Sequence, residues 1–501
     1  MPSASTSPNS LRRIQTYAVD RLQSPKAQLL AALGTTAALF IVAFGIESIT
    51  SSEGVIDFRP ALLCVSLLGF SIVSYVVWPS RWNILAHTQL AFGIVAYIIP
   101  ILFLGGGRLP ATDVLALYTT IMAIGLACAV GGSILGGWLA TRKRNEGFVD
   151  AITIPTATLT RPLPHRVAFV AFLAIVGVII AFLVMGFIPA LAADPYAAKF
   201  FRGIYAESYA PVAPLYRAST SALTVLLPLL TMFAAWRRKP VWIVLFIATV
   251  GILLLTLQRE PAVSGILLFI GAVIALRTRG MLLYFVGIVA VYFAGSASYF
   301  VFAALGIGNF SAGVGTNPLG FLESVAAGAP DVADQFVFLG AWLSNPVYAN
   351  GLTFVGGLIP GNFQWNPSVW SLAVTNPGAD VTTINSGGFR LPGPLWGYVN
   401  LGWFGVVLVG TVYGVLVGYL ARSVQRVLTL QAARIVRGDK SRERVVITFI
   451  VYAAIADCAT QFFALSYVSV IQTGLVLAIV YLGIKLPWRR KRNSSAIAEV
   501  L

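Results

Sequence analysis

Apolar runs long enough to cross a lipid bilayer recur along this chain, and they constrain its fold more than any other feature. A spanning helix needs roughly 20 predominantly apolar residues. Only 10% of the residues are charged, against about 25% in a soluble domain, so a water-soluble core is excluded. We therefore predict an all-α polytopic membrane protein with about 12 transmembrane helices. The predicted spans lie near 27–47, 59–78, 84–105, 111–139, 167–189, 219–236, 241–257, 262–277, 281–304, 398–421, 445–463 and 466–485.

The positions of Lys and Arg predict which side each loop faces, because cytoplasmic loops are enriched in these residues. With a cytoplasmic N-terminus and strict alternation, both termini are cytoplasmic, as the basic segments 1–26 and 486–501. The net charge of +16 then reflects orientation and attraction to anionic lipid headgroups, and nucleic-acid binding is not expected. Of the 34 basic residues, all but seven fall inside; the outer ones are Arg59, Arg108, Lys199, Arg202, Arg217, Arg259 and Arg390.

Two predicted outer segments are too long to be simple turns. A medium loop, 191–220, interrupts the first transmembrane part of the chain, 27–304, and a long one, 305–397, precedes the last spans, 398–485. Loops above about 12–15 residues are usually functional or disordered. Disordered segments are depleted in aromatic residues, so we expect the long loop to fold over the membrane surface. Its tryptophans are Trp342, Trp365, Trp370 and Trp396.

The medium loop interleaves basic and aromatic side chains. A guanidinium group binds phosphate through two parallel hydrogen bonds, and tyrosine rings can stack on sugars. This combination predicts a site for a lipid-linked sugar diphosphate, with Arg202 as a catalytic residue. The alternative is a belt of Tyr and Arg that anchors helix ends at the membrane surface. The predicted substrate-binding residues of this loop are Lys199, Arg217, Tyr205, Tyr209 and Tyr216.

Two further outer arginines are candidate catalytic residues. Arg259 lies between the seventh and eighth spans, where an unpaired cation at the edge of the bilayer is costly; the alternative is a structural ion pair with Glu260. Arg390 lies in the segment SGGFRLPGPLWG, residues 386–397. Glycines there let the backbone approach a ligand closely, and Trp396 is a candidate sugar contact. The alternative is an ordinary junction between a loop and a helix.

Acid–base residues are harder to assign, because no outer carboxylate is distinguished by its spacing. Glu207 shares the medium loop and Asp380 shares the long loop with Arg390, so these two are the candidate bases. Of the two histidines, His87 lies in a predicted span and His165 in a predicted cytoplasmic loop. No zinc spacing, P-loop or Ser-His-Asp set occurs, and the cysteines fall in apolar runs. We predict neither a metal nor a cofactor.

Two motifs resemble the bacterial oligosaccharide repeat-unit polymerases, the Wzy-type O-antigen polymerases. Residues 253–259 (LLLTLQR), followed by an apolar run over 262–275, are similar to that family's segment of apolar helix, small polar turn, Arg and apolar helix. Residues 396–405 (WGYVNLGWFG), continuing to Gly414 and Gly418, resemble the aromatic, Asn- and Gly-containing start of a late span in that family. The predicted topology, with a long outer loop late in the chain, resembles the family as well.

The resemblance implies that a chain carried on undecaprenyl diphosphate is transferred onto an incoming lipid-linked repeat unit. The reaction takes place at the outer face of the bacterial plasma membrane. Outer arginines are the functional residues of the family, and Arg202, Arg259 and Arg390 match that role. Cations at these positions stabilise the charge that develops on the departing lipid diphosphate. Besides membrane lipids, a chain-length regulator and a flippase are candidate partners.

Other functions remain open. Another lipid-linked-sugar glycosyltransferase would use Asp57 or Glu47 in the first outer loop as its base. O-antigen ligases, which resemble the polymerases, use an outer-loop His with Arg, and the absence of a predicted outer His disfavours them. A transporter or flippase requires polar residues at mid-membrane, for which His87 and Asp457 are the candidates.

Overall fold

The computed structural model describes residues 58–80, 83–93, 112–142, 162–277, 284, 286–288, 290, 331–356, 362–378, 389 and 391–436. Within this part of the chain every regular element is helical and no strand occurs. The helices long and apolar enough to cross a membrane lie within Asp113–Thr141, Pro164–Met185, Ala197–Arg237 and Gly393–Arg426. The predicted all-α membrane class is therefore confirmed for the described residues. The two termini, the spans predicted at 27–47, 445–463 and 466–485, and most of the spans predicted at 84–105 and 281–304 lie outside them.

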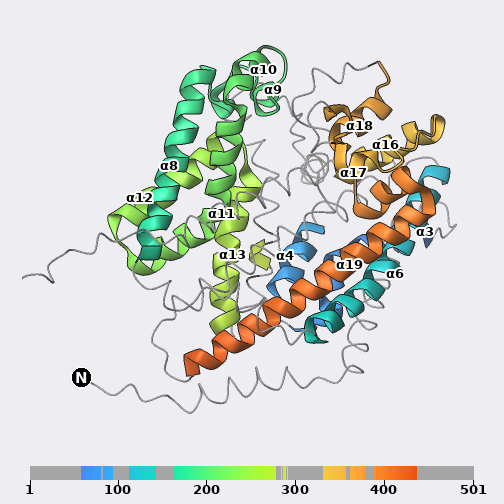
Figure 1. Ribbon diagram of the computed structural model, residues 1–501, viewed down its shortest axis with the longest axis horizontal. Helices are drawn as coiled ribbons and strands as arrows, with labels where there is room; N and C mark the ends of the chain where they lie inside the picture. Colours follow the sequence, from blue (N-terminus) through green and yellow to red (C-terminus); the bar gives the residue numbers. More distant parts are fainter. Residues whose placement is uncertain are drawn as a thin grey trace, which may run out of the picture.

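The long helices form two groups (Figure 1). The first group consists of α8 (Pro162–Met185), α11 (Ala213–Arg237), α12 (Pro240–Leu255) and α13 (Arg259–Arg277). The second group consists of α3 (Phe58–Val77), α4 (Ile84–Gly93), α6 (Thr112–Arg142) and α19 (Gly393–Val436). The groups join where α13 meets α4, and the core of the first group also includes Leu85 of α4 and Leu428 of α19.

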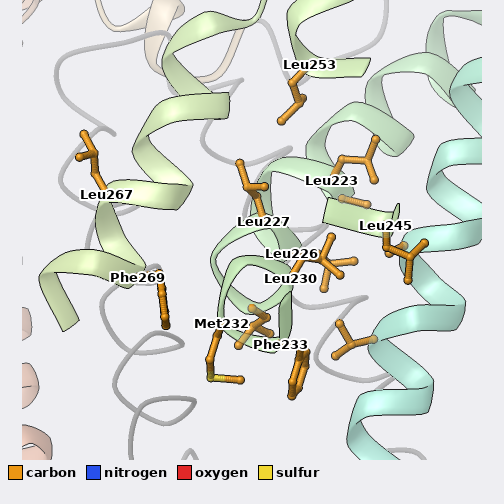
Figure 2. Packing of buried hydrophobic residues seen from close by; sticks show 14 of the residues in the cluster. Leu223, Leu226, Leu227, Leu230, Met232, Phe233, Leu245, Leu253, Leu267 and Phe269 are labelled. Atoms are coloured by element: carbon orange, nitrogen blue, oxygen red, sulfur yellow. The ribbon is translucent and has the colours of Figure 1, made fainter. Parts of the chain in front are cut away.

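Large apolar side chains hold the first group together. Helix α11 lies at its centre, and its side chains Leu223, Leu226 and Leu230 are fully buried (Figure 2). Phe233 packs on Trp242 of α12, with the ring centroids 4.6 Å apart. Because lipid tails are as apolar as leucine, tight packing rather than removal from water stabilises such contacts between membrane helices.

Small residues bring two helices of the second group, α6 and α19, together. Gly410, Gly414 and Gly418 recur at every fourth position of α19, and a Cβ atom on any of them would crowd the backbone of α6. Gly132 and Gly136 of α6 face the backbone of α19 in the same way. Rows of small residues at this spacing let two membrane helices approach until their backbones touch. The contact between α6 and α19 is therefore set by the absence of side chains.

Helices α6 and α19 run parallel. Gly410 lies opposite Gly125, and eight positions further along each helix Gly418 lies opposite Ser133. Strict alternation of spans from a cytoplasmic N-terminus also requires these two helices to run from the outer side to the cytoplasm. We call the end that carries the N-termini of α6, α11 and α19 the outer end, following this predicted orientation.

Helix α19 reverses direction near its start. Leu401 (φ −135°, ψ 18°) and Gly402 (φ 62°, ψ −148°) have non-helical backbone angles. Gly397 and Gly405 would be about 12 Å apart in a straight helix, yet a Cβ atom on Gly405 would overlap the carbonyl oxygen of Gly397. Residues 393–400 are therefore a short helix that folds back on the long one. The uninterrupted membrane helix begins after Gly402, a few residues later than the predicted start at 398.

The segment predicted as a long outer loop contains several helices. They are α16 (Asp331–Ser344), α17 (Leu352–Val355), the 3-10 turn η6 (Phe363–Trp365) and α18 (Pro367–Thr375). We call residues 331–356 and 362–378 the cap. In Figure 1 these helices lie at the outer end of α3, α6 and α19. The Tyr118 hydroxyl of α6 donates to Oε1 of Gln335 in α16, and both side chains are buried, so the cap is tied to the membrane helices.

Candidate functional site

A short helical segment rich in basic and aromatic residues connects α8 to α11. It consists of the 3-10 turn η3 (Pro189–Leu191), α9 (Pro195–Lys199), α10 (Ile204–Tyr209) and the 3-10 turn η4 (Ala210–Val212). We call residues 194–217, from just before α9 to the second turn of α11, the basic segment. Its helices α9 and α10 lie beside the outer ends of α8 and α11 in Figure 1. The medium loop predicted from sequence is thus folded onto the first group of helices.

Arg217, in the first turns of α11, is held by an aromatic cluster. Its Nε donates to the Tyr209 hydroxyl at 2.7 Å, and its guanidinium carbon lies 5.7 Å from the centroid of that ring. Phe201 stacks on Tyr209, with centroids 3.5 Å apart and planes inclined by 7°. Tyr216 meets both rings edge-on. A hydrogen bond to a charged group contributes about 1.5–3 kcal/mol, so this cluster fixes the position of a cation.

The three predicted tyrosines of the basic segment are buried against protein. Tyr205, Tyr209 and Tyr216 are exposed by only 9%, 2% and 3%. The Tyr205 hydroxyl accepts from the backbone N–H of Asp194 at 3.3 Å, and its ring packs on Phe187. In this arrangement the rings support neighbouring groups, and their contact with sugar stays a prediction.

Positive charge lies at the surface of the same segment. Lys199 Nζ and the guanidinium carbon of Arg202 lie 5.2 and 5.3 Å from the ring centroid of Phe200. Cations within about 6 Å of a ring are attracted by its electron-rich face. Arg202 is exposed, and Glu207, on α10, is exposed as well. The segment therefore presents Arg202 and Glu207, two of the predicted catalytic residues, to its surroundings.

Two strained turns lie just before arginines that the sequence predicts to be catalytic. Phe201 (φ 50°) follows α9 and Leu257 (φ 58°) follows α12. In each turn the next N–H bonds to the carbonyl oxygen five positions earlier, at 2.9 Å, which closes a Schellman motif. Glycine usually occupies this position, because a bulky residue is strained at positive φ. Phe201 immediately precedes Arg202, and Leu257 lies two positions before Arg259.

The structure brings the segments that carry three of the candidate arginines to one end of the first group. The hydroxyl of Tyr216, next to Arg217, lies close to the side chain of Thr256 at the end of α12. Helix α13 then begins at Arg259. No sequence signal paired the medium loop with Thr256, although Thr256 belongs to the LLLTLQR motif.

The remaining predicted residues divide between the cap and the undescribed part of the chain. Arg390, Asp380 and the side chain of Arg259 lie outside the described residues. Trp396 is buried where the cap meets the short helix 393–400. Its Nε1 donates to Thr353 Oγ1 at 3.0 Å, so the indole is bonded within the protein and does not face solvent.

Trp396 belongs to a buried network that sequence reasoning did not single out. Thr353 Oγ1 of α17 donates to Asn400 Oδ1 at 2.7 Å, and Asn400 Nδ2 donates to the Trp396 carbonyl oxygen at 2.8 Å. Both Thr353 and Asn400 are fully buried. The asparagine of the WGYVNLGWFG motif therefore fastens the cap to α19. The apolar neighbourhood of Asn400 was the signal that could have indicated this.

Among the described residues, no group of His, Cys, Asp or Glu could hold a metal ion. No protein-family model, no curated protein and no solved structure matches this chain. A function must therefore be argued from the residues themselves.

Proposed function

We propose that this chain polymerises undecaprenyl-diphosphate-linked oligosaccharide repeat units at the outer face of a bacterial plasma membrane. The proposal includes about 12 transmembrane helices and two cytoplasmic termini. The observation that carries it is Arg217, fixed by Tyr209 at the start of α11, with the neighbouring Tyr216 close to Thr256 in the turn before Arg259. Preorganised cations at one end of an apolar bundle suit a substrate with a lipid tail and a diphosphate head.

The reaction breaks the bond between the sugar C1 of the growing chain and the lipid diphosphate. A hydroxyl group of the incoming unit forms the new glycosidic bond and loses its proton, for which Glu207 and Asp380 are the candidate acceptors. Negative charge develops on the departing diphosphate. Arg202, Arg217, Arg259 and Arg390 would stabilise that charge, and one fixed donor of this kind accounts for about 10²–10³ in rate.

Deletion of the gene tests the activity directly. Surface polysaccharide from the deletion strain, separated on a gel, should show single repeat units in place of a ladder. Complete loss of surface sugar, with lipid-linked units accumulating inside, would indicate a flippase instead. Polymer of normal length that is no longer attached to its final acceptor would indicate a ligase.

The arginine hypothesis has its own test in the complemented deletion strain. Arg202→Ala, Arg259→Ala and Arg390→Ala should each shorten the ladder at normal expression, whereas Arg166→Ala, at the cytoplasmic end of α8, should not. If all three outer variants make polymer of normal length, Arg202, Arg259 and Arg390 have no role in the reaction.

A further inference from the structure

Beyond the first turn of α16, the cap lacks charge to an extent unusual for a segment in contact with water. Residues 335–379 contain no Asp, Glu, Lys, Arg or His, whereas about a quarter of the residues in a soluble domain are charged. The segment is nevertheless folded, with α16, α17 and α18 packed on α6 and on the short helix 393–400. A folded surface without charge is expected where the surroundings are lipid.

An aromatic edge connects the cap to the long part of α19. We use this name for Trp342, Tyr348, Tyr398 and Trp403. Trp342 lies 5.2 Å from Tyr348 and 5.5 Å from Tyr398, and Tyr398 lies 5.0 Å from Trp403, measured between ring centroids. The side chains of Tyr348 and Tyr398 also lie close to each other. Tyr348 and Trp403 are exposed by 43% and 44%, so the edge faces outward.

The aromatic edge continues an exposed apolar stripe on α19. Phe404, Val407, Leu408 and Val412 are exposed and recur at helical spacing on a helix long and apolar enough to span a membrane. In a spanning helix such a stripe contacts acyl chains. Trp403 lies at the outer end of the stripe, where Trp and Tyr concentrate because one part of each ring is apolar and the other can hydrogen-bond to headgroups.

We propose that the cap is immersed in the headgroup region of the outer leaflet, with the aromatic edge and the exposed Leu352 and Val355 facing lipid. The backbone reversal at Gly402 makes this possible, because it brings α17 down beside the start of the membrane helix: Ala349 N–H donates to the Val399 carbonyl oxygen at 3.0 Å. The occupant of this surface is phospholipid, and the inference stands whether or not the protein is a polymerase.

Spin labels on the full-length protein in phosphatidylethanolamine–phosphatidylglycerol vesicles test the proposal. Cys64, Cys128 and Cys458 are first changed to Ser, and single cysteines are then introduced as Tyr348→Cys, Leu352→Cys and Phe404→Cys. Power saturation compares collisions with oxygen, which partitions into lipid, and with a water-soluble nickel complex. Leu183→Cys, on an exposed apolar face of α8, is the lipid reference, and Glu207→Cys, on the exposed side of α10, is the water reference.

We expect the ratio of oxygen to nickel accessibility at positions 348, 352 and 404 to be well above the ratio at position 207. At position 404 it should match the ratio at 183. Labels at 348 and 352 that meet nickel as freely as position 207 would place the cap in water and overturn the proposal. Labels shielded from both reagents would show that protein, such as a second copy of the chain, covers this surface, and would overturn it equally.

Discussion

The basic segment and the cap lie at the same end of the molecule and use aromatic residues in opposite ways. In the basic segment a buried tyrosine hydroxyl, that of Tyr209, holds the charged side chain of Arg217. Where the cap meets the short helix 393–400, a buried indole, that of Trp396, donates to the neutral side chain of Thr353, which in turn donates to Asn400. Aromatic content alone therefore does not separate a charged site from a membrane-facing surface. The two are separated by the polar group that each ring contacts, which is charged in Arg217 and neutral in Thr353.

The largest effect is expected from a substitution that separates the short helix 393–400 from the long part of α19. Gly405→Leu places a side chain where the backbone of Gly397 lies, so the reversal cannot form as it stands. Overpacking of this kind costs on the order of 3 kcal/mol. Thermal unfolding in detergent should show a much lower midpoint than for Gly131→Leu, the matched change at an α6 glycine with open space around it. Equal midpoints would show that the contact between Gly397 and Gly405 does not define the reversal.

A comparable effect, on activity instead of stability, is expected in the basic segment. Arg217→Ala removes the fixed cation. The rate at which membrane vesicles form polymer from lipid-linked units should fall by about 100-fold. Arg237→Ala is the matched control, because Arg237 lies at the other end of the same helix and also packs on an aromatic ring, 5.2 Å from the centroid of Phe233. An equal rate for the two variants would remove Arg217 from the proposed site.

The neutral network of the cap should contribute less. Asn400→Ala leaves Thr353 without its buried acceptor, which should cost about 2 kcal/mol of unfolding free energy. The exposed Asn345→Ala is the control. A double-mutant cycle with Thr353→Val measures the coupling between the two side chains. Additive effects would show that the hydrogen bond between Thr353 and Asn400 does not fasten the cap.

The smallest of these effects tests how Tyr209 acts. Tyr209→Phe keeps the ring stacked on Phe201 and removes only the acceptor for Arg217 Nε. If this hydrogen bond contributes about 1.5 kcal/mol to holding Arg217 in place in the transition state, its loss lowers the rate about tenfold. Tyr348→Phe, which removes a hydroxyl from the cap, should leave the rate unchanged. Full activity of Tyr209→Phe, measured in the same vesicles, would mean that Arg217 is positioned without this hydrogen bond.

Much of the helical framework could be predicted, because a spanning helix needs only length and apolar composition. The runs 59–78, 111–139 and 167–189 coincide with α3, α6 and α8 to within a few residues. The placement of the tyrosines in the basic segment could not be predicted in this way. Tyr209 and Tyr216 pack on Phe201, which has a positive φ, and neither periodicity nor composition reports a positive φ at a residue other than glycine.

The sequence by itself determined that this chain is an all-helical membrane protein, and it located the basic segment and the tryptophan-rich long loop. Hydropathy and charge act residue by residue, so both can be read without knowledge of any partner. Only the tertiary structure decided that Tyr216 meets Thr256 beside the turn to Arg259, that Asn400 fastens the cap, and that α19 reverses at Gly402. Each of these depends on contacts between segments distant in the chain or on one backbone angle. Packing between helices, and not local composition, selects them.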